Sequence, residues 1–176
     1  TITNEYEIII VGSQSILGTF PNASDYFLKS MEADMYPYQD PKKSNFIEGV
    51  LGEESNFHQL YGYYAQGVSP ETSILPSGWQ DRLVSIRLND SVGYCLDVKD
   101  LAISKIVANR PKDIEFVTEM FLHDMVNKDE ILELIHELPI PEDLPNIINN
   151  AKTTLRIIST KLENIKPSTM QIKPKK

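Results

Sequence analysis

Hydrophobic and polar residues follow two different periods along the chain, and the change comes near residue 98. In the first half the apolar runs are short. Ile8-Ile9-Ile10-Val11 is β-branched and ends at Gly12-Ser13, which predicts a buried strand that turns sharply into a helix starting at Ser13. Residues 31–36 alternate apolar and acidic side chains and stop at Pro37, so we expect a second strand with one acidic edge.

The rest of the first half mixes helix and strand signals. Ser24 is a plausible N-cap of a short helix through residue 29, and residues 45–51 have helical spacing up to Gly52. The aromatic segment 61–68 favours strand over helix. Two further strands are expected at residues 83–88 and 92–96, joined by a hairpin at Asn89-Asp90.

From Val98 onward the apolar residues recur with helical spacing. Pro111 divides the first stretch into two helices, because the residue before a proline disfavours the α conformation. Further helices are predicted at about residues 128–138 and 144–165. The fold class is therefore α+β, with a small mixed sheet, flanking helices and a helical C-terminal half.

This pattern predicts a core over residues 1–97 and a helical region, 98–166, packed on it. Residues 167–176 are rich in lysine and proline, which favours a disordered basic tail over the alternative, a docking arm for RNA.

The composition bounds the function. The single cysteine, Cys95, cannot form an internal disulfide, and no apolar run approaches the ~20 residues that span a bilayer, so we expect a cytoplasmic protein with no membrane. Thr1 leads almost directly into the first strand, which suggests a trimmed N-terminus. The formal net charge of −8 argues against a protein that coats nucleic acid.

Two features of the first half could carry chemistry. Glycine in the Gly12-Ser13 turn permits close backbone approach, and the first amides of a following helix can hold a phosphate, although such turns are often only structural. The strand period sends Glu32 and Asp34 to the same side, where two carboxylates could bind Mg²⁺ or simply be solvated. Together, the turn and the acid pair would bring metal and triphosphate within reach of each other.

A polar loop and a basic segment add weaker candidates. His58 could act as a base, or it could be an ordinary loop histidine. Around Pro111, four charged residues could contact a triphosphate or could simply complement the helix ends. They are Lys105, Arg110, Lys112 and Asp113.

Over residues 7–123 the motifs in order resemble a bacterial family of uncharacterised nucleotidyltransferase-like proteins. The motifs that carry the resemblance are Val11-Gly12-Ser13-Gln14-Ser15-Ile16-Leu17-Gly18, Ser30-Met31-Glu32-Ala33-Asp34-Met35-Tyr36-Pro37, Gly52-Glu53-x-Ser55-x-Phe57-His58, Gly62-Tyr63-Tyr64-Ala65-x-Gly67-Val68, Leu75-Pro76-x-Gly78-Trp79-x-x-Arg82-Leu83 and Asp100-Leu101-Ala102-x-x-Lys105 through Lys112-Asp113. More distantly, the chain is similar to AbiEii-type toxins of toxin–antitoxin pairs.

The resemblance implies a residue-by-residue assignment. Gly12 and Ser13 would contact phosphate, Glu32 and Asp34 would hold Mg²⁺, and Lys105 would contact the nucleotide. Two features depart from the superfamily pattern: Glu-x-Asp stands where Asp-x-Asp is common, and the gap from Ser13 to Glu32 is long. The usual third carboxylate is missing from the expected strand, which leaves three substitutes, Glu53, Asp90 and Asp97.

Three functions fit these residues. The first is a metal-dependent nucleotidyltransferase that moves a nucleoside monophosphate from an NTP to a hydroxyl acceptor on RNA or protein. The second is a nucleotide-binding module that has lost its chemistry. The third is a protein whose helical half binds a partner, such as the antitoxin of a toxin–antitoxin pair.

Overall fold

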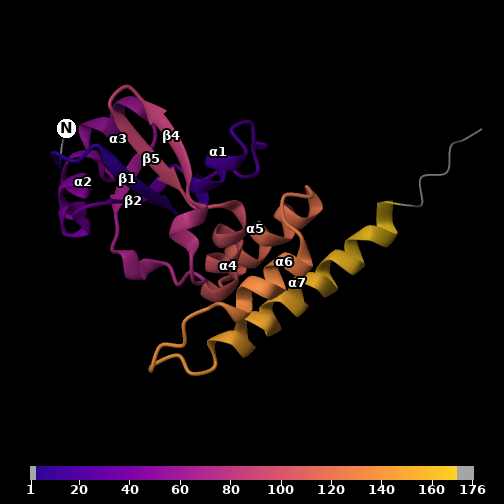
Figure 1. Ribbon diagram of the computed structural model, residues 1–176. Coiled ribbons are helices and arrows are strands. Elements are labelled where there is room, and N and C mark those ends of the chain that lie inside the picture. The colour runs from indigo at the N-terminus through magenta and orange to yellow at the C-terminus, as the bar shows by residue number, and fades with distance from the viewer. Residues whose placement is uncertain (1–2, 170–176) are drawn as a thin grey trace, which may run out of the picture. The chain divides into compact units, whose positions relative to one another are not determined.

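A computed structural model describes residues 3–169, with side chains from residue 3 to residue 165. The chain forms two compact units, one up to Leu101 and one from Ala102 onward (Figure 1). Each unit is described by itself.

The first unit is built on a mixed five-stranded sheet with the strand order β3-β2-β1-β5-β4. β1 pairs antiparallel with β2 and parallel with β5, while β2 and β3 run parallel and β4 and β5 run antiparallel. The predicted small mixed sheet is confirmed. The strands are β1 (Glu7–Val11), β2 (Glu32–Pro37), β3 (Tyr64–Gly67), β4 (Val84–Leu88) and β5 (Ser91–Cys95).

The pairing of β1 with β2 decides which side chains share a face of the sheet. Val11 lies opposite Asp34, and Ile10 lies opposite Met35. Because successive side chains of a strand point to opposite faces, Asp34 shares its face with Val11 and Glu32, whereas Met35 and Ile10 lie on the other face. We refer to these two faces as the carboxylate face and the apolar face.

The helices of the first unit are short. They are α1 (Ile16–Thr19), α2 (Ser44–Leu51) and α3 (Asn56–Tyr61). In Figure 1, α1 lies beside β4 and β5, and α2 lies at the opposite side of the sheet near β3. Gly18 of α1 permits this packing, since a Cβ built there would lie 2.5 Å from the Cβ of Cys95, whose side chain is buried.

Three local predictions for this unit were wrong. The helix expected at Ser13 is a 3-10 turn, Ser13–Ser15, and α1 then ends at Thr19, because Pro21 disfavours a helical Phe20. The helix expected from Ser24 is only a turn in which the Phe27 amide donates to the Ser24 carbonyl. The segment expected as one strand begins with the end of α3 and becomes strand only from Tyr64.

The second unit is helical, as predicted, and Pro111 separates two of its helices. α4 (Val98–Ala108) begins in the first unit and is followed by α5 (Pro111–Leu122), α6 (Lys128–His136) and α7 (Ile147–Thr169). Residues 167–169 of the predicted disordered tail are helical, and 170–176 lie outside the described residues.

Each unit has its own apolar core. In the first, Ile9, Ile16 and Leu96 are fully buried, and in the second Ile103, Met120 and Ile131 are. Within the described part of the chain, every helix is too short or too polar to cross a membrane.

Candidate active site

The two predicted carboxylates lie at the more exposed end of β2. Glu32 and Asp34 are half-buried, whereas Tyr36 farther along the same face is 4 % exposed. The parallel register places Glu32 beside Tyr64 and Asp34 beside Gln66 of β3. The carboxylate face therefore passes from a sealed core to an accessible acidic end along a single strand.

The Gly12 turn lies directly against this acidic end. Its φ is +67°, in the left-handed region that favours glycine, and a Cβ built on it would lie 2.2 Å from Oδ2 of Asp34. Any side chain at Gly12 would thus collide with the carboxylate. The structure thus places the glycine turn close to Asp34, one member of the acid pair.

The turn that follows Gly12 is tight. The Ser15 amide donates to the Gly12 carbonyl over 3.2 Å and its hydroxyl donates to the same oxygen over 2.8 Å, with the Ser15 side chain buried. Any phosphate contact at Gly12 and Ser13 would therefore come from this turn, because α1 starts only at Ile16.

Tyr64 is the member of this group that the sequence did not reveal. Burial raises the pKa of its hydroxyl, and the negative charges of Glu32, Glu53 and Asp34, with a hydrogen bond to Glu32, raise it further. The Tyr64 hydroxyl thus lies in the electrostatic field of three carboxylates. Nothing local in the sequence marks it, because its partner strand is 32 residues away and the pairing is parallel.

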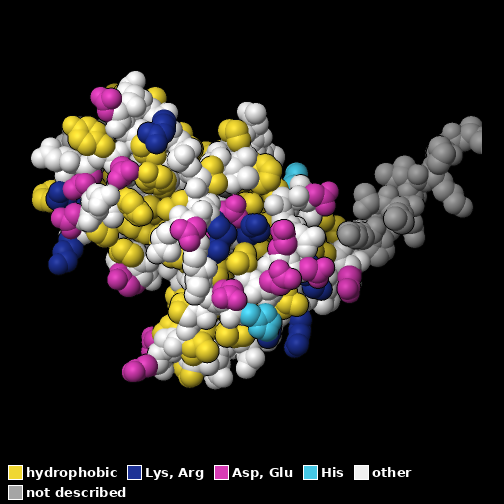
Figure 2. All heavy atoms as spheres, in the orientation of Figure 1, with side chains coloured by type: hydrophobic (Ala, Val, Ile, Leu, Met, Phe, Trp, Pro, Cys, Tyr) yellow, Lys and Arg dark blue, Asp and Glu magenta, His cyan; other side chains and the backbone are white. Residues whose placement is uncertain are grey.

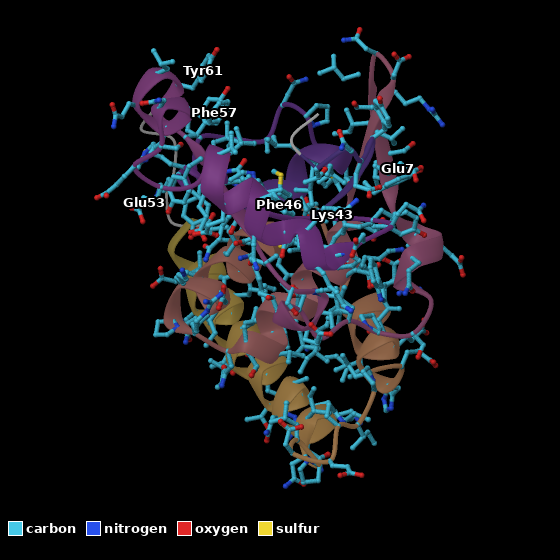
Figure 3. All side chains as sticks on the ribbon, turned by 90° about the vertical axis from the view of Figure 1, so that its left-hand side faces the viewer. Glu7, Lys43, Phe46, Glu53, Phe57 and Tyr61 are labelled. Carbon is cyan, nitrogen blue, oxygen red and sulfur yellow. The ribbon has the colours of Figure 1, made fainter. Side chains whose placement is uncertain are left out.

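Of the three substitutes for the missing third carboxylate, only Glu53 contributes to the field at Tyr64. It stands in the turn between α2 and α3, where Figure 3 shows it just before Phe57 and Tyr61 of α3. Asp90 lies in the β4–β5 hairpin, near the start of β1, whereas Gly12 follows the end of β1. Asp97 caps α4 by accepting from the Lys99 amide. Among the described residues, no three His, Cys, Asp or Glu side chains are grouped closely enough to hold a metal.

His58 is engaged at the start of α3. Its Nδ1 accepts from the Glu54 amide over 3.0 Å, and its own amide donates to Ser55, the N-cap. Its ring lies 4.9 Å from the Tyr64 ring. Since Nδ1 accepts, the neutral ring carries its proton on Nε2 and contributes a donor rather than a base.

The four charged residues around Pro111 belong to the second unit. Asp113 is fully buried and accepts from Lys105 over 3.4 Å and from two nitrogens of Arg110. Lys105 is 8 % exposed, and its Nζ lies 4.3 Å from the centre of the Phe116 ring. Lys112 is exposed in the first turn of α5.

The pKa shifts of this cluster follow from burial and pairing. Burial lowers the pKa of the Lys105 ammonium, and the neighbouring Asp113 only partly offsets it. Burial alone would raise the pKa of the Asp113 carboxyl, but the hydrogen bonds and charges of Arg110 and Lys105 outweigh burial, so the pKa is lowered. These groups therefore compensate one another's charges inside the second unit.

Residues 1–159 match a family described as "Nucleotidyltransferase of unknown function (DUF6036)". The chain belongs to this family. The match covers both the Gly12 turn with the β2 carboxylates and most of the helical unit, and it confirms a nucleotidyltransferase-like fold. No curated protein and no solved structure matches the chain.

Because the family is one of nucleotidyltransferases, we ask whether Glu32 and Asp34 fit a metal that binds together with an NTP. Their chemistry fits a magnesium ion. Mg²⁺ is commonly held by one or two carboxylates together with substrate phosphates and water, and Glu32 and Asp34 are oxygen donors of this type. Figure 2 shows one face of the surface, where Lys and Arg are scattered among Asp and Glu.

Proposed function

We propose that this chain is a metal-dependent nucleotidyltransferase that moves a nucleoside monophosphate from an NTP to a hydroxyl acceptor on RNA or protein. The observation that carries the proposal is the contact between the left-handed Gly12 turn and the Asp34 carboxylate, with Glu32 two residues away on the same face. Membership in a nucleotidyltransferase family supports the same reaction class.

The chain's own residues have distinct tasks in this proposal. Glu32 and Asp34 hold the metal, and Tyr64, which lies beside Glu32 in the parallel register, helps to orient that carboxylate. Gly12 lets the Asp34 carboxylate lie against the backbone of the turn, because it has no side chain to collide with that carboxylate. Bound Mg²⁺ would neutralise triphosphate charge and lower the pKa of the attacking hydroxyl.

The acceptor oxygen forms a bond to the α-phosphorus of the NTP, and the bond from that phosphorus to the pyrophosphate breaks. A carboxylate of the Glu32–Asp34 pair takes the proton of the acceptor hydroxyl in this proposal. His58 is not needed as the base, since its Nδ1 already accepts from the Glu54 amide.

The nucleotide contacts expected from Lys105, Arg110, Lys112 and Asp113 stay predictions. Lys105 is 8 % exposed and lies beside a buried carboxylate, which favours a structural role within the second unit. Arg110, with a side chain 60 % exposed, and Lys112 are the members that a phosphate could reach most readily.

A second candidate is a module that binds a nucleotide or a partner without chemistry and that could belong to a toxin–antitoxin pair. One observation favours it: the described residues hold no group of three metal-binding side chains. The toxin–antitoxin role and an antitoxin partner stay predictions.

The test is transfer of label from each α-³²P-NTP, with Mg²⁺, to total RNA and to total protein of the source cell. The transferase proposal expects label in one fraction, lost in Asp34→Asn. Binding of NTP with no label in either fraction would replace it by the second candidate.

A further inference from the structure

The apolar face of the sheet carries a cavity of about 510 Å³, on the side away from Glu32 and Asp34. Its floor is formed by Ile10, Ala33 and Met35, which the strand period turns to this face. Ala33 stands between the two carboxylates in the sequence but projects from the opposite side of β2. The cavity is therefore separate from the proposed active site.

The size and lining of the cavity suit a small organic molecule. Pockets for such ligands measure about 300–1,000 Å³ and are mostly apolar, with few polar groups. The described residues that line this one include no charged side chain, and the polar ones are Gln14, Ser30 and Tyr63. A charged ligand would lose its hydration without gaining a partner, so the ligand must be neutral.

Gln14 indicates which polar group the ligand carries. Its Nε2 donates to the Ser30 carbonyl over 2.6 Å. Because a carbonyl oxygen can only accept, the amide nitrogen must face Ser30, and Oε1 is directed elsewhere. Gln14 lines the cavity, and no described residue donates to this Oε1, so a ligand N–H in the cavity would find an acceptor there in place of water.

Large apolar side chains that are partly exposed to solvent surround the opening of the cavity. Met31 is 57 % exposed, Tyr63 is 54 % and Ile86 is 44 %. A tyrosine ring offers a face or edge for aromatic contact, and methionine adapts its shape to a ligand. Aromatic ligands gain most from such a rim.

We propose that this cavity is a second ligand site that binds a neutral, flat aromatic molecule with an N–H donor, of the class to which indole belongs. The site is independent of the nucleotidyltransferase reaction, since it lies on the other face of the sheet.

The experiment titrates the full chain with indole and follows saturation by calorimetry or ligand-observed NMR. 1-Methylindole has the same ring but lacks the N–H, so it should bind about three- to tenfold more weakly, the worth of one neutral hydrogen bond. Indole-3-carboxylate should not bind, because its charge has no partner in the cavity.

Substitutions in the lining test whether indole binds in this cavity. Ala33→Leu should fill the floor and weaken indole binding about tenfold, since overpacking costs more than 1 kcal/mol. Gln14→Leu should remove the difference between indole and 1-methylindole. Leu88→Ala is the control, because Leu88 is 73 % exposed on β4 and outside the lining, and its affinity should equal that of the wild type.

If Ala33→Leu does not fold, as judged by circular dichroism, Met31→Ala at the rim replaces it, with an expected loss of about threefold. Equal affinity in all variants, or no saturation with indole, would overturn the proposal. Loss of indole binding in Asp34→Asn would move the probe to the carboxylate face and also overturn it. A dimer that Met31→Asp dissociates would assign the cavity to a second copy of the chain instead.

Discussion

Two clusters of charged residues in this chain differ in what surrounds their carboxylates. Asp113 in the second unit is fully buried and joined to two cations, Lys105 and Arg110. On β2, Glu32 and Asp34 are half-buried, and their negative charges, with that of Glu53, raise the pKa of the Tyr64 hydroxyl. Removing one partner of a buried ion pair destabilises a fold because it leaves an uncompensated charge, whereas neighbouring like charges are typical of a site for a cation.

The largest expected effect is a loss of unfolding free energy when the buried carboxylate of the second unit is removed. Asp113→Ala leaves Lys105 buried without its carboxylate, which should cost about 3–5 kcal/mol of unfolding free energy. Urea unfolding measures it. Arg110→Ala is the matched control and should cost about 1 kcal/mol or less, because its side chain is 60 % exposed. A loss below about 1 kcal/mol in Asp113→Ala would show that this cluster is only a set of helix-end charges.

The second prediction concerns the activity that depends on the two carboxylates of β2. Glu32→Gln and Asp34→Asn should each lower label transfer about hundredfold or more, since charge stabilisation by a metal is worth several kcal/mol. Their urea midpoints should equal that of the wild type or exceed it, because like charge is removed. Asp25→Asn, at an exposed aspartate, controls for the loss of one charge. A stability loss as large as that of Asp113→Ala would contradict the distinction.

The sequence predicted the parts of this comparison that depend on local pattern. Period-two alternation was enough to place Glu32 and Asp34 on one face, and the Gly-Ser turn was recognised from its position after a strand. The hairpin between β4 and β5 and the break at Pro111 also follow from local residue types.

What the sequence missed depends on contacts between distant segments. Tyr64 lies beside Glu32 only because β2 and β3 pair in parallel. A parallel pair needs a long connection, and here that connection contains α2 and α3. The aromatic residues around Tyr61 favoured strand, although Ser55 in fact caps a helix by accepting from the His58 amide. The burial of Lys105 depends on how α5 packs, which periodicity does not specify.

The third prediction concerns how the stability contributed by Asp113 changes as the pH falls. Because the folded-state pKa of Asp113 lies below its ordinary value of 3.8, its contribution to stability is complete above that value and is lost as pH falls through the lowered pKa. Stability curves from pH 6 to pH 2 should therefore fall less steeply at the acid end in Asp113→Asn than in the wild type. Parallel curves would show that pairing does not lower this pKa.

The smallest expected effect is that of Tyr64→Phe. Removing the hydroxyl takes away a polar group beside Glu32, so Mg²⁺-dependent NTP affinity should fall about two- to tenfold while the fold stays intact. Tyr63→Phe is the control on the neighbouring residue, which lines the apolar cavity instead. Equal losses in the two variants would indicate a general change in β3 rather than the loss of a contact to Glu32.

The most direct test of the carboxylate site is the melting temperature of the wild type, Glu32→Gln and Asp34→Asn with Mg²⁺ and each NTP. At a free ligand concentration about 100 times the Kd, binding adds about 2.7 kcal/mol, which corresponds to a rise of about 5–10 °C. We expect this rise in the wild type only when Mg²⁺ is present, and we expect it to be absent in both variants. Equal shifts in all three proteins, or shifts independent of Mg²⁺, would contradict the assignment of metal and nucleotide to Glu32 and Asp34.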